Sequence, residues 1–269
     1  MQTPNPIPNP IPNPILMRAA AVLLSACWLN ALAATADIPG STIVPPPASA
    51  DGTPFKLTTG VYDVSGGGLP AGPGLDLNLR YGYGGGNHLW LGYYRSPAMG
   101  FSQARAGWDA VYGIGAVRLL PSLQVASGGF VGGSLAAEAG STWFAGGGLG
   151  RTNLRNYANL NFDPNDSVTV YGGYRWDDAD SVVLQLVRDN RRNPDQQNLH
   201  LIWRNELADG ERFTVDLLDK QGTVDDRFIR RAGLSFNYEW RRWFVKAAFD
   251  PKVNFTAQNM LRISTGARF

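Results

Sequence analysis

The chain of 269 residues has little of what catalytic and metal-binding sites are usually built from. It contains one cysteine, Cys27, and two histidines, His88 and His200. One cysteine cannot form an internal disulfide, and these residues do not have the spacing of metal ligands. Lysine and arginine number 24 against 22 acidic residues, so no basic excess indicates a nucleic acid partner. We therefore assign no catalytic, cofactor-binding or metal-binding residue and expect no cofactor.

Long hydrophobic runs are also scarce, and the one that stands out lies near the N-terminus. Met17 and Arg18 precede the apolar stretch Ala19 to Leu29, which small residues follow as far as Ala36. A charged, then apolar, then small-residue order is typical of a secretory signal peptide, with cleavage after Ala36 or Ala33. We predict an N-terminal extension and signal peptide over residues 1–36.

Two features of this segment leave alternatives open. The first sixteen residues repeat PNPI without a charge, which favours translation from Met17 over Met1. Cys27 ends the tetrapeptide LSAC, which resembles a lipoprotein signal, but the short apolar run before it favours an ordinary residue of the signal peptide. Residues 37–53 are rich in proline and serine and predict a leader or loose plug.

From residue 54 to residue 269 the chain alternates apolar and polar residues in short segments, as β-strands with two different faces do. The clearest is Leu75–Tyr83, LDLNLRYGY. The others are Leu89–Arg95, Val111–Ser127 with a break at Pro121, Phe130–Ala139, Trp143–Leu149, Asn156–Phe162, Val168–Trp176, Val182–Arg188, Leu199–Arg204, Phe213–Leu218, Ile229–Tyr238, Trp243–Phe249 and Leu261–Phe269.

Short polar turns between these segments predict consecutive hairpins. A mean hydropathy of -0.18 with 17% charged residues suits strands that are apolar on one side only. Because backbone groups in lipid must pair internally, the remaining way to span a membrane is a closed barrel. We predict an all-β, transmembrane, antiparallel up-and-down β-barrel over residues 54–269, with about 12 strands and with 10 or 14 as alternatives.

The final segment carries a resemblance to a known class. In LRISTGARF, Leu261 and alternate residues up to Phe269 share one face. This resembles the C-terminal strand of Gram-negative outer-membrane β-barrels, from which Ala267 departs where a bulkier residue is common. The resemblance implies outer-membrane localisation after export through the inner membrane, with periplasmic termini and Phe269 as the assembly signal. The implied partners are outer-membrane lipid, the secretion and barrel-assembly machinery and periplasmic chaperones. A soluble β-sandwich is the alternative.

Aromatic residues cluster near the predicted strand ends, where we expect them at the headgroup level of the membrane. These clusters are Trp90 with Tyr93 and Tyr94, Trp143 with Phe144, Tyr171 with Tyr174 and Trp176, and Tyr238, Trp240, Trp243 and Phe244.

The alternation also nominates residues that line a lumen. They are Asp76, Asn78, Arg80, Arg175, Gln185, His200, Arg204, Arg212, Asp216, Arg231, Glu239, Lys246, Asp250, Arg262 and Arg268. Bases outnumber acids in this set, so the charges either pair and plug the barrel or line a hydrated path that prefers anions.

We therefore predict a small channel or transport-related protein of the outer membrane. One alternative is a membrane enzyme acting on lipid, in which His200 beside Asp216 or Ser235 is the residue suited to act as a base. Another is a non-conducting structural or surface-interaction barrel that displays Asp189–Asn198 and Asp219–Asp226. The sequence leaves the transported substrate, the sidedness of the loops and the oligomeric state open.

Overall fold

The computed structural model describes residues 53–67, 72–177, 179–208 and 211–269, which belong to one compact unit. The predicted signal peptide, Cys27 and residues 37–52 of the predicted leader lie outside the described residues. Among the described helices, none is both long enough and apolar enough to cross a membrane.

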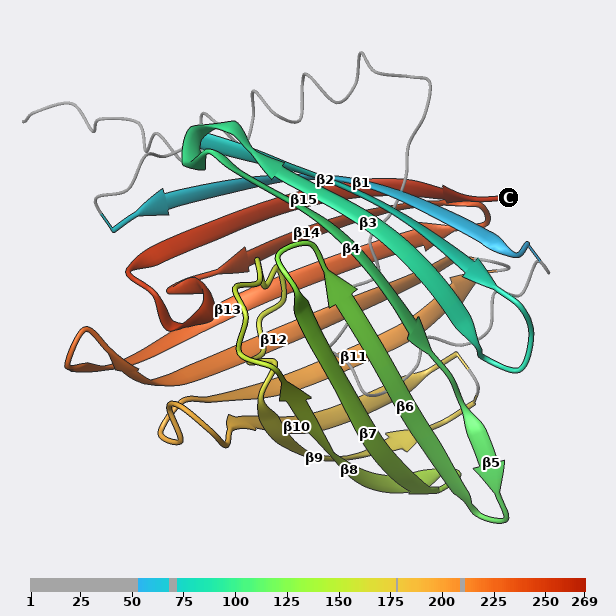
Figure 1. Cartoon of the computed structure of the whole chain (residues 1–269). Coiled ribbons are helices and arrows are strands. Elements are labelled where there is room, and N and C mark those ends of the chain that lie inside the picture. The colour runs from blue at the N-terminus through green and yellow to red at the C-terminus, as the bar shows by residue number, and fades with distance from the viewer. Residues whose placement is uncertain (1–52, 68–71, 178, 209–210) are drawn as a thin grey trace, which may run out of the picture. The chain divides into compact units, whose positions relative to one another are not determined.

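Antiparallel strands form one sheet that closes on itself (Figure 1). The strands are β1 (Phe55–Gly66), β2 (Gly72–Gly82), β3 (His88–Ser96), β4 (Phe101–Asp109), β5 (Tyr112–Ile114), β6 (Val117–Ala126), β7 (Phe130–Gly140), β8 (Trp143–Thr152), β9 (Ser167–Arg175), β10 (Ser181–Asp189), β11 (Gln197–Ala208), β12 (Glu211–Val224), β13 (Arg227–Trp240), β14 (Trp243–Asp250) and β15 (Gln258–Arg268). Two short 3-10 helices, η1 (Pro97–Met99) and η2 (Val253–Phe255), lie in connections. Neighbours in sequence pair, except β4 and β5, and β1 also pairs with β15, so blue and red strands lie side by side in Figure 1.

The barrel has fourteen strand positions, because β4 and β5 both pair with β6 and occupy one position. The predicted antiparallel up-and-down barrel is confirmed, with fourteen strands in place of about 12. The two additional strands, β1 and β4, carry a weak apolar signal. In β4, for example, Ala104 and Ala106 occupy outward positions where other strands carry leucine or valine.

The predicted strand Asn156–Phe162 is wrong. The structure has no strand between Thr152 and Ser167, and this stretch runs inside the barrel. Its alternation of polar and apolar residues is real, but the apolar side chains pack against the inner wall and its backbone bonds to side chains. An alternation of polar and apolar residues shows that a segment has two sides in different surroundings. It does not show that the segment pairs with a neighbouring strand.

Pro121 breaks the neighbouring strand rather than its own. Strand β6 continues through Pro121, which pairs with Leu135 of β7. On its other side, the Ala110 N–H donates to the Pro121 carbonyl at 3.1 Å, but proline has no N–H to return. The adjacent strand is therefore divided into β4 and β5 at Ala110 and Val111.

The two faces of the sheet differ in polarity throughout. In β2, Leu75 and Leu77 are 52% and 50% exposed, whereas Asp76 and Asn78 are each 2% exposed. Large apolar side chains thus cover the outer face and polar side chains fill the interior, as expected for a barrel in lipid. We call the end where β1 begins and β15 ends the terminal end, and the opposite end the loop end.

The predicted aromatic belt is correct for only part of its members. Trp143, Trp176 and Trp243 are exposed on the outside, but Trp90, Tyr94, Phe144, Tyr171 and Phe244 are buried in the interior. Adjacent aromatic residues in a strand necessarily point to opposite faces. The inward rings lie over glycines: a Cβ on Gly146 would meet the Tyr171 ring at 2.5 Å.

This close approach gives a test of the interior packing. We expect Gly146→Ala to destabilise the barrel by roughly 1–3 kcal/mol, because the added methyl overpacks the ring of Tyr171. The measurement is urea-induced unfolding, in which the folded fraction at each urea concentration is read from the heat-dependent gel shift. Gly113→Ala is the matched control, since a Cβ there meets nothing within 4 Å. Equal stability of the two variants would contradict the packing described here.

Candidate functional site: a polar lumen crossed by an inserted loop

The connection between β8 and β9, residues 153–166, folds into the barrel and is here called the inserted loop (Figure 1). Two apolar side chains anchor it. Leu160 is 7% exposed and packs in a cluster with Tyr62 of β1 and Val253 of η2. Phe162 is 1% exposed and packs against Leu218 of β12 and Ala248 of β14. The inserted loop therefore crosses the lumen from β8 and β9 to the wall around β1, β15 and β14, which lies on the far side of the ring.

Polar side chains of the wall satisfy the backbone of the inserted loop. Arg262 Nη1 donates to the Leu160 carbonyl at 3.0 Å, and Asn198 Nδ2 donates to the Phe162 carbonyl at 2.7 Å. Gln103 Oε1 accepts from the Ala158 N–H at 3.1 Å. These bonds replace a strand ladder, since buried backbone groups need partners. They fix the inserted loop in the half of the lumen next to the loop end.

His200 links the inserted loop to the wall. It is 0% exposed, its Nδ1 lies 3.0 Å from Asp216 Oδ1, and its Nε2 lies 3.0 Å from Asp163 Oδ1. Asp216 belongs to β12 and Asp163 to the inserted loop. Both ring nitrogens are thus occupied by carboxylates, so neither is available in this arrangement to take a proton from a substrate. The geometry suits a latch for the loop.

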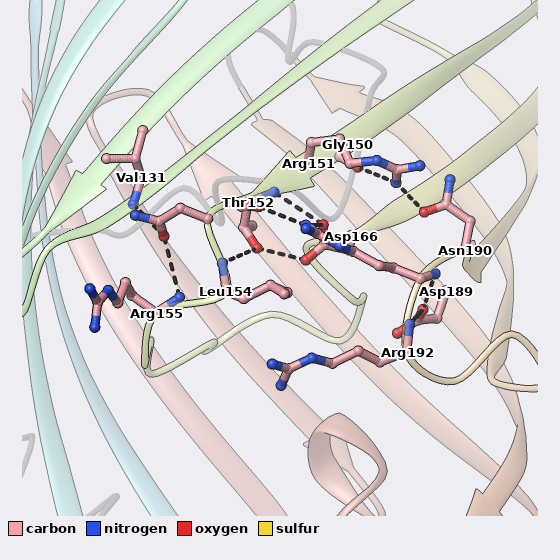
Figure 2. A network of polar contacts seen from close by, with 12 residues as sticks. Val131, Gly150, Arg151, Thr152, Leu154, Arg155, Asp166, Asp189, Asn190 and Arg192 are labelled. Carbon is pink, nitrogen blue, oxygen red and sulfur yellow. Dashed lines mark hydrogen bonds and ion pairs between the residues drawn. The ribbon is translucent and has the colours of Figure 1, made fainter.

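A second set of contacts clamps the two ends of the inserted loop together (Figure 2). Asp166 accepts from the Thr152 N–H at 3.1 Å and from Thr152 Oγ1 at 2.6 Å. Arg191 Nη1 donates to Asp166 Oδ1 at 3.0 Å and to the Thr152 carbonyl at 2.7 Å. Burial alone would raise the pKa of Asp166, but the hydrogen bonds from Thr152 and Arg191 outweigh it and hold the pKa below the ordinary 3.8.

Charges inside the lumen differ between its two halves. Near the loop end and the middle, Arg105 pairs with Asp76, Lys220 with Asp250, and Arg262 reaches the inserted loop. With Asp163 and Asp216 around His200, acids there match or exceed the bases. The interior of this half is therefore neutral or slightly acidic.

The half next to the terminal end is strongly basic. Eight cationic residues, each within four residues of the terminal end of its strand, lie on the inner face: Lys56, Arg80, Arg118, Arg175, Arg204, Arg212, Lys246 and Arg268. The inner-face acids there are Asp109, Glu138, Glu239 and Glu206, which is exposed at the mouth and pairs in register with Arg212. An excess of cations in a confined space creates a positive potential that attracts anions.

Most of the residues nominated from sequence lie on this inner wall. Asp76, Arg80, His200 and Arg262 are buried, while Arg175, Arg204, Glu239, Lys246 and Arg268 are of intermediate exposure. Arg231 differs: it shares a face of β13 with Glu239 but is exposed, because β14 pairs with β13 only from Leu234 onward. Whether these residues line a conducting path stays a prediction.

Sequence reasoning missed several inner-wall charges. Lys56, Arg105 and Asp109 lie on strands β1 and β4, which were not recognised. Arg118, Glu138 and Lys220 lie on or beside recognised segments but were not nominated. Each of the six lies at a position that alternates with outward residues, so a known strand register would have been enough to assign it to the inner face. Phe269 stacks on Phe55 with ring centroids 5.7 Å apart, and its proposed role in assembly is untested.

Comparisons with known proteins bear on the fold. Protein-family models give no match to this chain, and neither do curated proteins. Among solved structures, the Acinetobacter baumannii outer membrane protein Omp33 is similar with a TM-score of 0.51 and 9% identity, over 81% of this chain and 98% of that chain. A KdgM porin in complex with disordered oligogalacturonate has a TM-score of 0.43 and 13% identity, over 79% and 98%. A triple mutant of the Rhodopseudomonas blastica porin has a TM-score of 0.46 and 11% identity, over 81% and 99%.

The closed antiparallel barrel, its apolar exterior and the likeness to Omp33 define the class of protein. This chain has the fold of an outer-membrane β-barrel. At 9% identity the likeness speaks for the fold alone. In the described part of the chain, no group of three or more histidine, cysteine, aspartate or glutamate residues is arranged to hold a metal ion.

The Asp166 clamp predicts that Asp166→Asn loosens the inserted loop at neutral pH. We expect hydrogen exchange over residues 153–166 to accelerate about tenfold, the equivalent of ~1.4 kcal/mol, for the loss of charge-assisted hydrogen bonds at a partly exposed site. The measurement is hydrogen exchange by mass spectrometry. Asp195→Asn, in the connection between β10 and β11, is the control.

The same clamp has a defined pH dependence. Because the folded pKa of Asp166 is lowered, its contribution is present above the ordinary pKa and is lost as the pH falls through the folded value. Exchange of the wild-type loop, corrected for intrinsic rates, should therefore stay slow at pH 5 and rise only below about pH 4. A rise already at pH 6 would assign the loss of protection to another group.

Proposed function

We propose that the protein is an outer-membrane channel whose lumen favours anions. The observation that carries this proposal is the excess of inner-face cations over acids in the half of the lumen next to the terminal end. A channel lined by one sign of charge concentrates the opposite ion and repels its own kind.

The way these cations are held supports the proposal. Phe244 is 0% exposed, and three cations gather around its ring: Lys56 Nζ lies 4.8 Å, Lys246 Nζ 5.7 Å and the Arg268 guanidinium 5.3 Å from the centroid. A ring attracts cations through its quadrupole without carrying a net charge. Glu239 is a carboxylate close to this group, where it pairs with Arg268 and interacts with Lys56, so one negative charge faces several positive ones.

The inserted loop limits what can pass. It occupies the loop-end half of the lumen. A solute that crosses the barrel must therefore be small enough to fit between the inserted loop and the wall. The proposal is therefore a narrow channel for small solutes, and a lumen that the loop closes completely is the rival outcome of the test below.

The proposal includes the place and orientation of the barrel. Exposed leucine, valine and tryptophan side chains around its outside suit contact with outer-membrane lipid. With periplasmic termini, as the resemblance implies, the basic half of the lumen faces the periplasm. The proposed export and assembly partners, with Phe269 as the assembly signal, belong to the same proposal.

Conductance of the refolded protein in a planar bilayer under a salt gradient tests this function. We expect small stable steps and a reversal potential of the sign for anions. Lys56→Gln combined with Lys246→Gln should reduce the anion preference severalfold, because both charges around Phe244 are removed. Asp166→Asn should increase the noise of the open current as the inserted loop loosens.

Arg230→Gln is the matched control. Arg230 faces outward, 69% exposed, and pairs with Asp219 at 2.7 Å, so its removal should leave selectivity unchanged. A reversal potential of the sign for cations would overturn the anion preference. A barrel that shows the heat-dependent gel shift but no current would overturn the channel.

A further inference from the structure

We infer that Arg175, Arg204 and Arg212 form a binding site for multivalent oxyanions, such as compounds with two or more carboxylate or phosphate groups, near the terminal end of the lumen. This inference deepens the proposed function, because the site lies on the proposed anion path and names the class of solute that would dwell there.

The pairing register brings the three arginines together. Ser181, the first residue of β10, pairs with Arg175 of β9 on one side and with Arg204 of β11 on the other. Arg204 in turn pairs with Thr214 of β12, and Arg212 lies two residues from Thr214 on the same face. Neighbouring strands are about 4.8 Å apart, so Arg175 and Arg204, two strands apart, arise about 10 Å from each other. Arg212 lies one strand beyond Arg204 and two residues along, so Arg204 stands between the other two arginines.

Two of these guanidinium groups have unused hydrogen-bond donors. Among the described residues, no side chain or carbonyl accepts a hydrogen bond from Arg204 or Arg212. The Nη2 of Arg212 lies 3.7 Å from Glu239 Oε2, too far for a hydrogen bond, while Arg268 Nη2 occupies the same oxygen at 2.9 Å. A guanidinium carries five N–H donors, and inside a protein such donors find partners.

Arg175 is held in place by groups that leave much of its charge free. Its guanidinium lies over the Phe144 ring, 4.2 Å from the centroid. It donates to the Ser141 carbonyl at 3.0 Å and approaches Glu138 Oε1 at 3.4 Å, an oxygen that Arg118 also binds. Stacking on an aromatic ring restricts the guanidinium and leaves the N–H donors at its edges available for hydrogen bonds.

Electrostatics within the trio favour an anion between its members. Arg204 is repelled by Arg212 and by Arg175, and the attraction from Glu239 and Asp216 is shared with other cations. Like charges held together in a confined space are stabilised when an oxyanion lies between them. The planar fork of arginine matches both oxygens of a carboxylate or phosphate, which a lysine cannot do.

The site is accessible from solvent within the barrel. The side chains of Arg175 and Arg212 are 20% and 21% exposed. Arg175 and Ser181 flank the connection between β9 and β10 at the terminal end, so a solute entering there meets the trio before it reaches the inserted loop.

Isothermal titration calorimetry of the full chain, refolded in detergent at 0.15 M sodium chloride, tests the site with two probes: pyrophosphate and citrate. Saturable binding of both probes, or of one alone, supports the site; the second case also states whether phosphate or carboxylate is preferred. We expect Arg204→Gln to weaken binding about tenfold or more. Arg204→Lys keeps the charge but loses the fork, and we expect it to weaken binding by an intermediate factor.

Arg230→Gln is the control that removes the same charge from the outer wall and should leave the binding constant unchanged. Every variant must show the heat-dependent gel shift of the folded barrel. If Arg204→Gln does not fold, Arg212→Gln makes the same test, since Arg212 lies at the second position of β12.

The outcomes separate this inference from the proposed channel. Anion-selective current without saturable heat from either probe would overturn the binding site and leave the channel standing. Saturable heat that depends on Arg204, from a barrel without current, would keep the site and overturn the channel. Equal weakening by Arg204→Gln and Arg230→Gln would reduce the effect to general charge and overturn the site.

Discussion

The pairing of β1 with β15 is the constraint on which the rest of the structure depends. A sheet in lipid cannot leave an edge, because each unpaired N–H or carbonyl there has no water to bind. Once the first and last strands pair, every wall residue has a determined face, and alternation sends one set of side chains to lipid and the other to the interior. Closure thus forces Asp76, His200 and Arg262 into a space where each must find a partner.

The interior answers this demand in two different ways. Near the loop end, a segment of the chain itself supplies partners: the inserted loop places Asp163 against His200 and the Leu160 carbonyl against Arg262. Near the terminal end, aromatic rings are contact partners of the charged side chains, and cations lie over the rings of Phe244 and Phe144. The first solution neutralises charge and fills space, whereas the second leaves more cations than carboxylates on the inner wall. This difference between the two halves of the lumen is the basis of the proposed function.

The sequence predicted the barrel and much of its inner wall because both rest on a local period of two. The boundaries of β9, β10 and β14 follow their alternation closely. The period could not reveal the inserted loop, whose Leu160 and Phe162 alternate like a strand yet pack on wall residues far away in the sequence. It also missed β4, where small outward residues hide the pattern and Pro121 acts from the neighbouring strand. The Arg204 trio depends on register across three hairpins, which no single segment encodes.

The unequal distribution of charge along the lumen has a consequence for any current that crosses it. A passage with fixed positive charge at one mouth and near-neutrality at the other fills with counter-ions when the voltage drives them in from the charged side, and is depleted when the voltage is reversed. Such a passage rectifies. The sign of the rectification would then report which mouth faces which side of the membrane, so an electrical measurement on an oriented barrel can read its topology.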